Sequence, residues 1–76
     1  MVNNFPSRET VDCLRKQFPR GARVELVRME DPYTQLKPGD CGTVEFVDDA
    51  GSLEVLWDCG STLSVLYGVD ACRRID

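Results

Sequence analysis

The sequence predicts a small, mainly β domain with one α-helix at its N-terminal end. Hydrophobic residues recur with a helical period over residues 7–18. From position 22 onward they alternate with polar residues, and turns containing glycine or proline separate the alternating segments. The chain has 76 residues, 42% of them hydrophobic and 29% charged, which is enough for one domain with a small core.

Residues 7–18 have the pattern of an amphipathic helix. Ser7 is placed to cap its N-terminus, and Pro19 ends it. One apolar stripe is formed at positions i, i+3 and i+7 by Val11, Leu14 and Phe18. A helix this short is marginally stable alone, so we expect the stripe to pack on another element.

Five short strands are expected in the rest of the chain, with a long, proline-containing loop over 31–40. Their ranges are 22–28, 42–47, 52–57, 61–66 and 72–75. The alternation assigns to the core the side chains of Val44, Phe46, Leu53, Val55 and Trp57. A small domain hides its strand edges by closing its sheet. The predicted fold is therefore a five-stranded SH3-like barrel over 22–76, with a helical extension over 1–21.

The cysteines and the N-terminal residues indicate a cytoplasmic protein with free thiols. Residues 1–6 contain neither a basic leader nor an apolar segment, and no apolar run is long enough to span a membrane. The sequence has no Cys-x-x-Cys pair and no histidine, which disfavours zinc at Cys13, Cys41, Cys59 and Cys72. We find no nucleophile beside a base and no phosphate-binding glycine loop, so neither an enzyme nor a cofactor is expected.

Several ordered motifs resemble a short family numbered 4314 among the domains of unknown function. They are Phe18-Pro19-x-Gly21-x-Arg23-Val24, Asp31-Pro32-Tyr33-Thr34, Pro38-Gly39-x-x-Gly42-Thr43-Val44, Trp57-Asp58-x-Gly60-Ser61 and Gly68-Val69-Asp70. The resemblance runs from about Phe5 to Ile75 and supports the barrel, but it implies no activity. It also implies a phage or mobile-element context, because members of that family occur in Firmicutes genomes, their phages and mobile elements.

The candidate binding surface combines aromatic and acidic residues. Tyr33, Trp57 and Tyr67 are candidates for an aromatic surface of the kind that holds a proline-rich peptide in SH3 domains. Glu30 and Asp31 would read basic residues of such a partner, and Asp58 lies beside Trp57. The competing interpretation is that Trp57 belongs to the core and that the two tyrosines pin loops. We expect a non-enzymatic module that binds another protein through the 31–40 loop.

Two other functions remain open. The net charge of −4 and scattered bases weigh against nucleic-acid binding, although the clusters at 15–23 and 73–74 are candidate basic patches. An inhibitor of a host defence system would instead use an acidic face. That face would be formed by Asp31, Asp40, Glu45, Asp48, Asp49 and Glu54.

Overall fold

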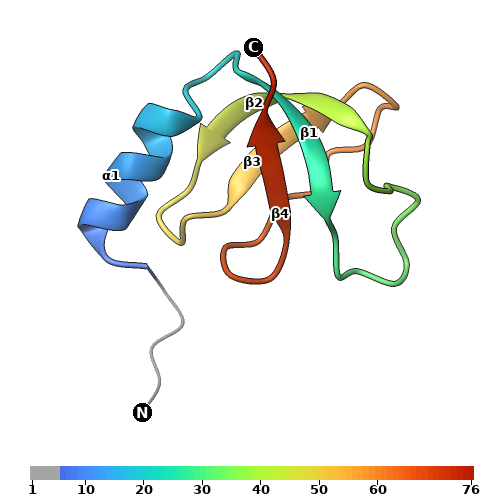
Figure 1. The fold of residues 1–76 in the computed structure, drawn as a ribbon. Helices are drawn as coiled ribbons and strands as arrows, with labels where there is room; N and C mark the ends of the chain where they lie inside the picture. Colours follow the sequence, from blue (N-terminus) through green and yellow to red (C-terminus); the bar gives the residue numbers. More distant parts are fainter. Residues whose placement is uncertain (1–5) are drawn as a thin grey trace.

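The computed structural model describes residues 6–76, which form one helix packed on one antiparallel sheet (Figure 1). In chain order the elements are α1 (Arg8–Gln17), β1 (Arg23–Arg28), β2 (Cys41–Val47), β3 (Leu53–Trp57) and β4 (Ala71–Arg74). The sheet order is β3-β2-β1-β4. A mainly β fold with an N-terminal helix is thus confirmed. Residues 1–5, on which the expected extension over 1–21 and the leader interpretation partly rest, lie outside the described residues.

Helix α1 begins and ends where the sequence predicts. The Ser7 hydroxyl accepts a hydrogen bond from the Thr10 backbone N–H at 3.1 Å, and the Phe18 N–H donates to the Leu14 carbonyl at 2.8 Å. Val11 and Phe18 are buried, and Leu14 packs partly against the core. The predicted apolar stripe therefore attaches the helix to the sheet.

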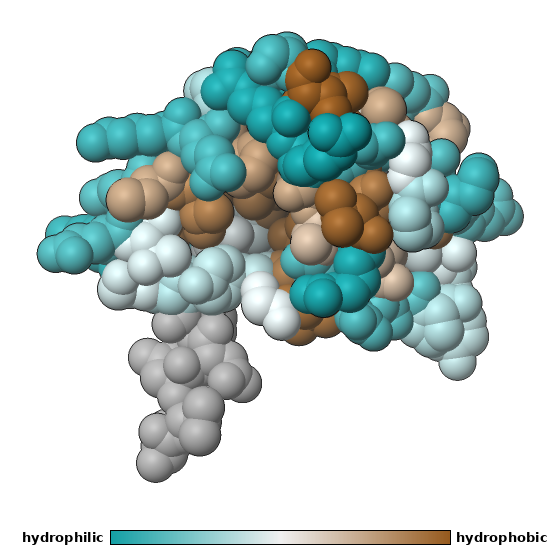
Figure 2. Space-filling view, viewed as in Figure 1, coloured by the Kyte–Doolittle hydropathy of each residue, from teal (hydrophilic) through white to brown (hydrophobic). Residues whose placement is uncertain are grey.

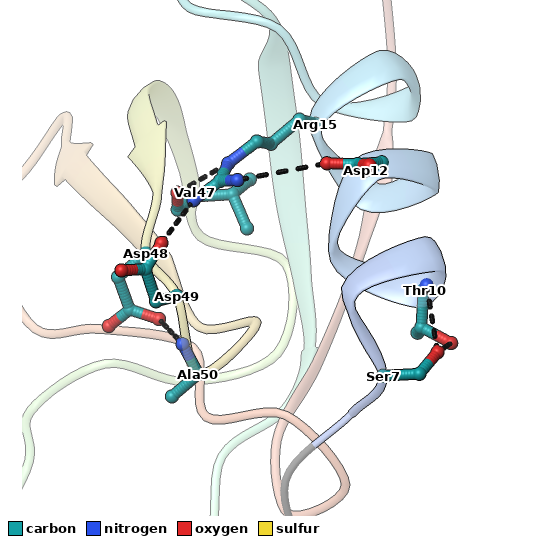
Figure 3. A network of polar contacts seen from close by, with 8 residues as sticks. All are labelled: Ser7, Thr10, Asp12, Arg15, Val47, Asp48, Asp49 and Ala50. Carbon is teal, nitrogen blue, oxygen red and sulfur yellow. Dashed lines mark hydrogen bonds and ion pairs between the residues drawn. The ribbon is translucent and has the colours of Figure 1, made fainter.

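Arg15 ties the outer side of α1 to the turn between β2 and β3 (Figure 3). Its Nε donates to the Val47 carbonyl at 3.1 Å, and its Nη2 donates to the Asp49 carboxylate at 2.9 Å. Within the turn, the Asp48 carboxylate accepts from the backbone N–H of Ala50 at 3.0 Å (Figure 3). It also accepts from the Ser52 N–H at 2.9 Å. These bonds fix the helix against one end of the sheet.

The predicted strand over 61–66 is wrong, because this segment keeps only a single bridge to β3. Leu53 and Val65 exchange backbone hydrogen bonds of 3.0 and 2.9 Å, and the Trp57 N–H donates to the Ser61 carbonyl at 2.9 Å. Between these two points Leu63 leaves the ladder. Its N–H donates to the Ser61 hydroxyl at 3.3 Å, and its carbonyl accepts from the Trp57 indole at 2.8 Å.

The five-stranded closed barrel is consequently wrong as well. The sheet has four strands and is open, with β3 and β4 at its two edges (Figure 1). The segment 61–70 crosses from one edge to the other without forming a continuous ladder. It is held by Asp70, whose carboxylate accepts from the Glu30 N–H at 2.8 Å and from the Leu66 N–H at 3.0 Å.

Phe46, which the alternation placed in the core, is 55% exposed, so that prediction is wrong. Val44 pairs with Val55, but the next pair along the strands is Phe46 with Glu54, so Glu45 is the extra residue of a β-bulge. The bulge turns Phe46 to the outer face of the sheet. Val44, Leu53, Val55 and Trp57 are buried as predicted.

In the view of Figure 2 hydrophobic residues show in the middle of the visible face, and hydrophilic residues cover most of its margin. The core lies between the sheet, the C-terminal end of α1 and the loops. It is built from strand, helix and loop residues together: Phe18, Ala22, Val24, Leu26, Leu36, Val44, Val47, Leu53, Val55, Trp57 and Val65.

Replacing Phe46 with alanine is expected to destabilise the protein far less than replacing Phe18. Truncation of a buried phenylalanine leaves a cavity and costs about 3–5 kcal/mol. The same change at a half-exposed position costs about 1 kcal/mol or less. Urea denaturation of Phe18→Ala and Phe46→Ala, compared with the parent protein, measures the two losses. Equal losses would contradict the bulge at Glu45.

The Cys72 thiol is expected to make stability fall at alkaline pH. Cys72 packs against the core, and burial raises its pKa to about 11. Since the unfolded chain ionises this thiol near pH ~8.5 and the folded chain does not, the folded state holds the extra proton over this interval. The free energy of unfolding therefore decreases as pH rises from about 8.5 towards 11. In the Cys72→Ala variant this slope should be smaller, and an unchanged slope would refute the assignment.

Candidate functional site

A groove of about 710 Å³ lies between the long loop after β1 and the turn after β3. The loop contributes one wall with residues 31–37, and the turn contributes the other with residues 59–63. Leu36 and Leu63 supply apolar surface, whereas the other lining residues are polar or small apart from the ring of Tyr33. These other residues are Asp31, Thr34, Gln35, Lys37, Asp40, Cys59, Ser61 and Thr62.

Local hydrogen bonds give the 31–40 loop a defined shape. The Asp31 carboxylate accepts from the Tyr33 N–H at 2.9 Å, and the Thr34 hydroxyl accepts from the Leu36 N–H at 3.1 Å. Such side-chain-to-backbone bonds are the reason that Asp and Thr favour turns. Leu36 is buried and anchors the middle of the loop.

The base of the loop is tied to β1. The Leu26 N–H donates to the Asp40 carbonyl at 2.7 Å, and the Gly39 N–H donates back to the Leu26 carbonyl at 2.9 Å. Gly39 has a φ of +99°, a conformation that an L-residue with a side chain rarely adopts. The loop that carries Tyr33 therefore has its C-terminal end fixed to β1 and an apolar anchor at Leu36.

The buried side chain of Trp57 supports the wall formed by residues 59–63. Its ring is 3% exposed, and its indole N–H donates to the Leu63 carbonyl at 2.8 Å. Gly60 takes a φ of +97° in the turn, and Cys59 is exposed at its tip.

Of the predicted binding residues, the structure brings Asp31 and Tyr33 into this groove. Tyr33 is 93% exposed, the largest value among the exposed large hydrophobic residues described. Trp57 lies in the core, in agreement with the competing interpretation. Tyr67 lines a different cavity, of about 270 Å³, between α1 and β4. The three aromatic rings therefore do not form one surface.

Asp58 is engaged on the outer face of the sheet. Arg23 donates from two nitrogens to its two carboxylate oxygens, at 2.7 and 2.5 Å, and also to the Thr43 hydroxyl at 2.9 Å. These hydrogen bonds lower the pKa of Asp58 and raise that of Arg23. Through Arg23, Asp58 thus connects β1 to the end of β3.

Hydrogen bonds from Arg74 and from the Arg23 backbone similarly lower the pKa of Asp76.

Glu30 lies just before the groove and is already partnered. Its carboxylate is 3.7 Å from Arg28, and its backbone N–H donates to Asp70. It lies outside the set of residues that line the groove, whereas its neighbour Asp31 belongs to that set.

Sequence reasoning missed the wall formed by residues 59–63, because it assigned positions 61–66 to a strand. One signal was present. Ser61 stands two residues before Leu63, which is the spacing at which a serine hydroxyl accepts from a backbone N–H and favours a turn. Leu36 was missed because a single apolar residue in a loop has no periodic pattern.

The polar, aliphatic and aromatic side chains that line the groove are of the kind that binds a partner by hydrogen bonds and apolar contact. Among residues 6–76 no group of three or more cysteine, aspartate or glutamate side chains is placed to hold a metal ion. All four thiols are free, and Cys13 and Cys59 are the exposed ones. Helix α1 has neither the length nor the apolar character required of a membrane-crossing helix.

The comparisons with known proteins identify a family. No match is found among curated proteins or among solved structures. One family profile, described as a domain of unknown function (DUF4314), matches residues 7–75, nearly the whole chain. This is the family that the sequence motifs resemble. The chain therefore belongs to the DUF4314 family.

Proposed function

We propose that this chain is a non-enzymatic interaction module that binds a segment of another protein in the groove between residues 31–37 and 59–63. The observation that carries the proposal is Tyr33, an aromatic residue that is 93% exposed and lines a groove of about 710 Å³. An aromatic side chain gains most from burial, and tyrosine is enriched among the residues that dominate binding energy at interfaces.

The construction of the groove supports binding without a large rearrangement. The C-terminal end of the loop is hydrogen-bonded to β1 through Gly39 and Asp40, and Leu36 is buried beneath the loop. Just before the loop, the Glu30 N–H donates to the Asp70 carboxylate. The opposite wall rests on the buried Trp57 ring. A preformed surface loses less conformational entropy on binding, so more of the contact energy appears as affinity.

Nucleic-acid binding is the weaker alternative. Affinity for nucleic acid depends on basic side chains that are free to reach phosphates. Six of the nine basic residues lie in ion pairs with carboxylates, namely Arg15, Arg23, Arg28, Lys37, Arg73 and Arg74. This pairing lowers the positive potential of both candidate basic patches.

An acidic inhibitory face is also less well supported. Asp40 precedes β2 and Asp48 follows it, so they are separated by a seven-residue strand, about 23 Å long. Asp49 is paired with Arg15, and the Glu54 carboxylate accepts from the Ser64 hydroxyl. The six candidate acids are therefore divided between the two ends of the sheet.

Tyr33→Ala is expected to weaken partner binding at least about tenfold while leaving stability unchanged. Short peptides selected from a random display library against the parent chain supply the ligands, and fluorescence anisotropy measures their affinity. Phe46→Ala is the matched control, because it removes an exposed aromatic ring from outside the groove. Ligands that bind both variants as tightly as the parent would overturn the proposed function.

A further inference from the structure

The binding groove continues into a second, smaller hollow. This hollow has a volume of about 190 Å³ and is lined by Met29, Asp31, Leu63, Ser64, Leu66 and Asp70. Asp31 and Leu63 line the groove as well. The two cavities therefore meet at these two residues, and an extended segment lying in the groove reaches the hollow by crossing between them.

The smaller hollow suits one aliphatic side chain. Its volume lies below the ~300–1,000 Å³ of sites that hold drug-sized molecules. Met29, Leu63 and Leu66 give it apolar surface. Asp70 is buried, and each of its carboxylate oxygens already accepts a backbone N–H that holds the 61–70 segment in place.

Asp31 is the carboxylate at the junction that remains open to a cation. Within residues 6–76 it takes part in no ion pair, and one of its oxygens accepts from the Tyr33 N–H. The other charged residues that line the groove, Lys37 and Asp40, lie 3.5 Å from each other. An arriving cation therefore meets an unneutralised charge at Asp31.

The Tyr33 ring adds a second attraction for the same cation. It lies two residues after Asp31, lines the same groove and is almost entirely exposed. Guanidinium groups stack on tyrosine faces and bind carboxylates with two parallel hydrogen bonds. Arginine combines both properties in one side chain, and the net charge of −4 favours approach of a basic segment.

We propose, resting on the function proposed above, that the partner segment carries an arginine that binds Asp31 and Tyr33. A neighbouring aliphatic residue of the same segment enters the hollow lined by Met29, Leu63 and Leu66. The groove then binds a basic residue next to an apolar one, and the rest of the peptide lies along the 59–63 wall.

The test compares two variants that each lose one negative charge, one inside the groove and one outside it. Asp31→Asn and Asp49→Asn each remove one negative charge, but Asp49 lies in the turn between β2 and β3, outside the groove. Peptides selected by display on the parent chain are expected to be enriched in arginine next to leucine, isoleucine or methionine. Their affinity should fall about fivefold to tenfold in Asp31→Asn and remain unchanged in Asp49→Asn. Added salt should weaken binding to the parent more than to Asp31→Asn.

A charge swap gives the sharper result. In Asp31→Arg the preference should reverse, so that a selected peptide with its arginine changed to glutamate binds better than the original. Labelling provides an independent check of location, since a bulky maleimide on Cys59 should block binding and one on Cys13 of α1 should not. Ligands that need Tyr33 but show no basic preference would overturn this inference and leave the proposed function standing. Ligands indifferent to Tyr33 would remove both.

Discussion

The hydrogen bond from the Trp57 indole to the Leu63 carbonyl is the interaction on which the rest of this structure depends. Trp57 is the last residue of β3, and its ring is buried in the core. A buried indole N–H requires a partner, because leaving it unpaired costs about 1–3 kcal/mol. The carbonyl that it takes is one that a regular fourth strand would have used in its ladder. Satisfying the tryptophan therefore interrupts the sheet, and the same bond sets the height of the 59–63 wall above the core.

The hydrogen bond from Trp57 to Leu63 links the open sheet to the candidate site. Because residues 61–66 keep only the bridge at Val65, the sheet stays open and the segment lies along its edge. The side chains of residues 61–63 then face the 31–37 loop and enclose the groove. A barrel closed by five regular strands would instead have used the backbone of this segment for pairing. The binding surface is thus a product of the same polar requirement that prevents closure.

The sequence predicts the elements whose signals are local. Ser7 and Pro19 bound the helix, and the alternation around Val24 and Val55 gives the inward faces of β1 and β3. It fails where one residue alters the register or where a side chain competes with the backbone. The bulge at Glu45 shifts the alternation by one position and exposes Phe46, which no periodic pattern can reveal. The bonds of Ser61 and Trp57 to Leu63 depend on positions that the fold brings together. In the candidate site, Asp31 and Tyr33 could be predicted from the residues of the 31–40 loop, whereas the wall formed by residues 59–63 could not.

The division of charge explains why one small region of this acidic chain is suited to recognition. Most carboxylates are used in folding: Asp48 and Asp70 accept backbone N–H groups, and Asp58 joins β1 to the end of β3 through Arg23. An exposed ion pair such as Arg23–Asp58 adds little stability, typically less than about 1 kcal/mol, but it leaves neither partner free for a ligand. Asp31 differs from the ion-paired carboxylates because, within residues 6–76, it takes part in no ion pair, and it differs from Asp48 and Asp70 because it lines the groove. An unpaired carboxylate at Asp31 beside the exposed Tyr33 side chain favours a cationic partner. The turn itself requires only the Tyr33 backbone N–H and not its aromatic ring.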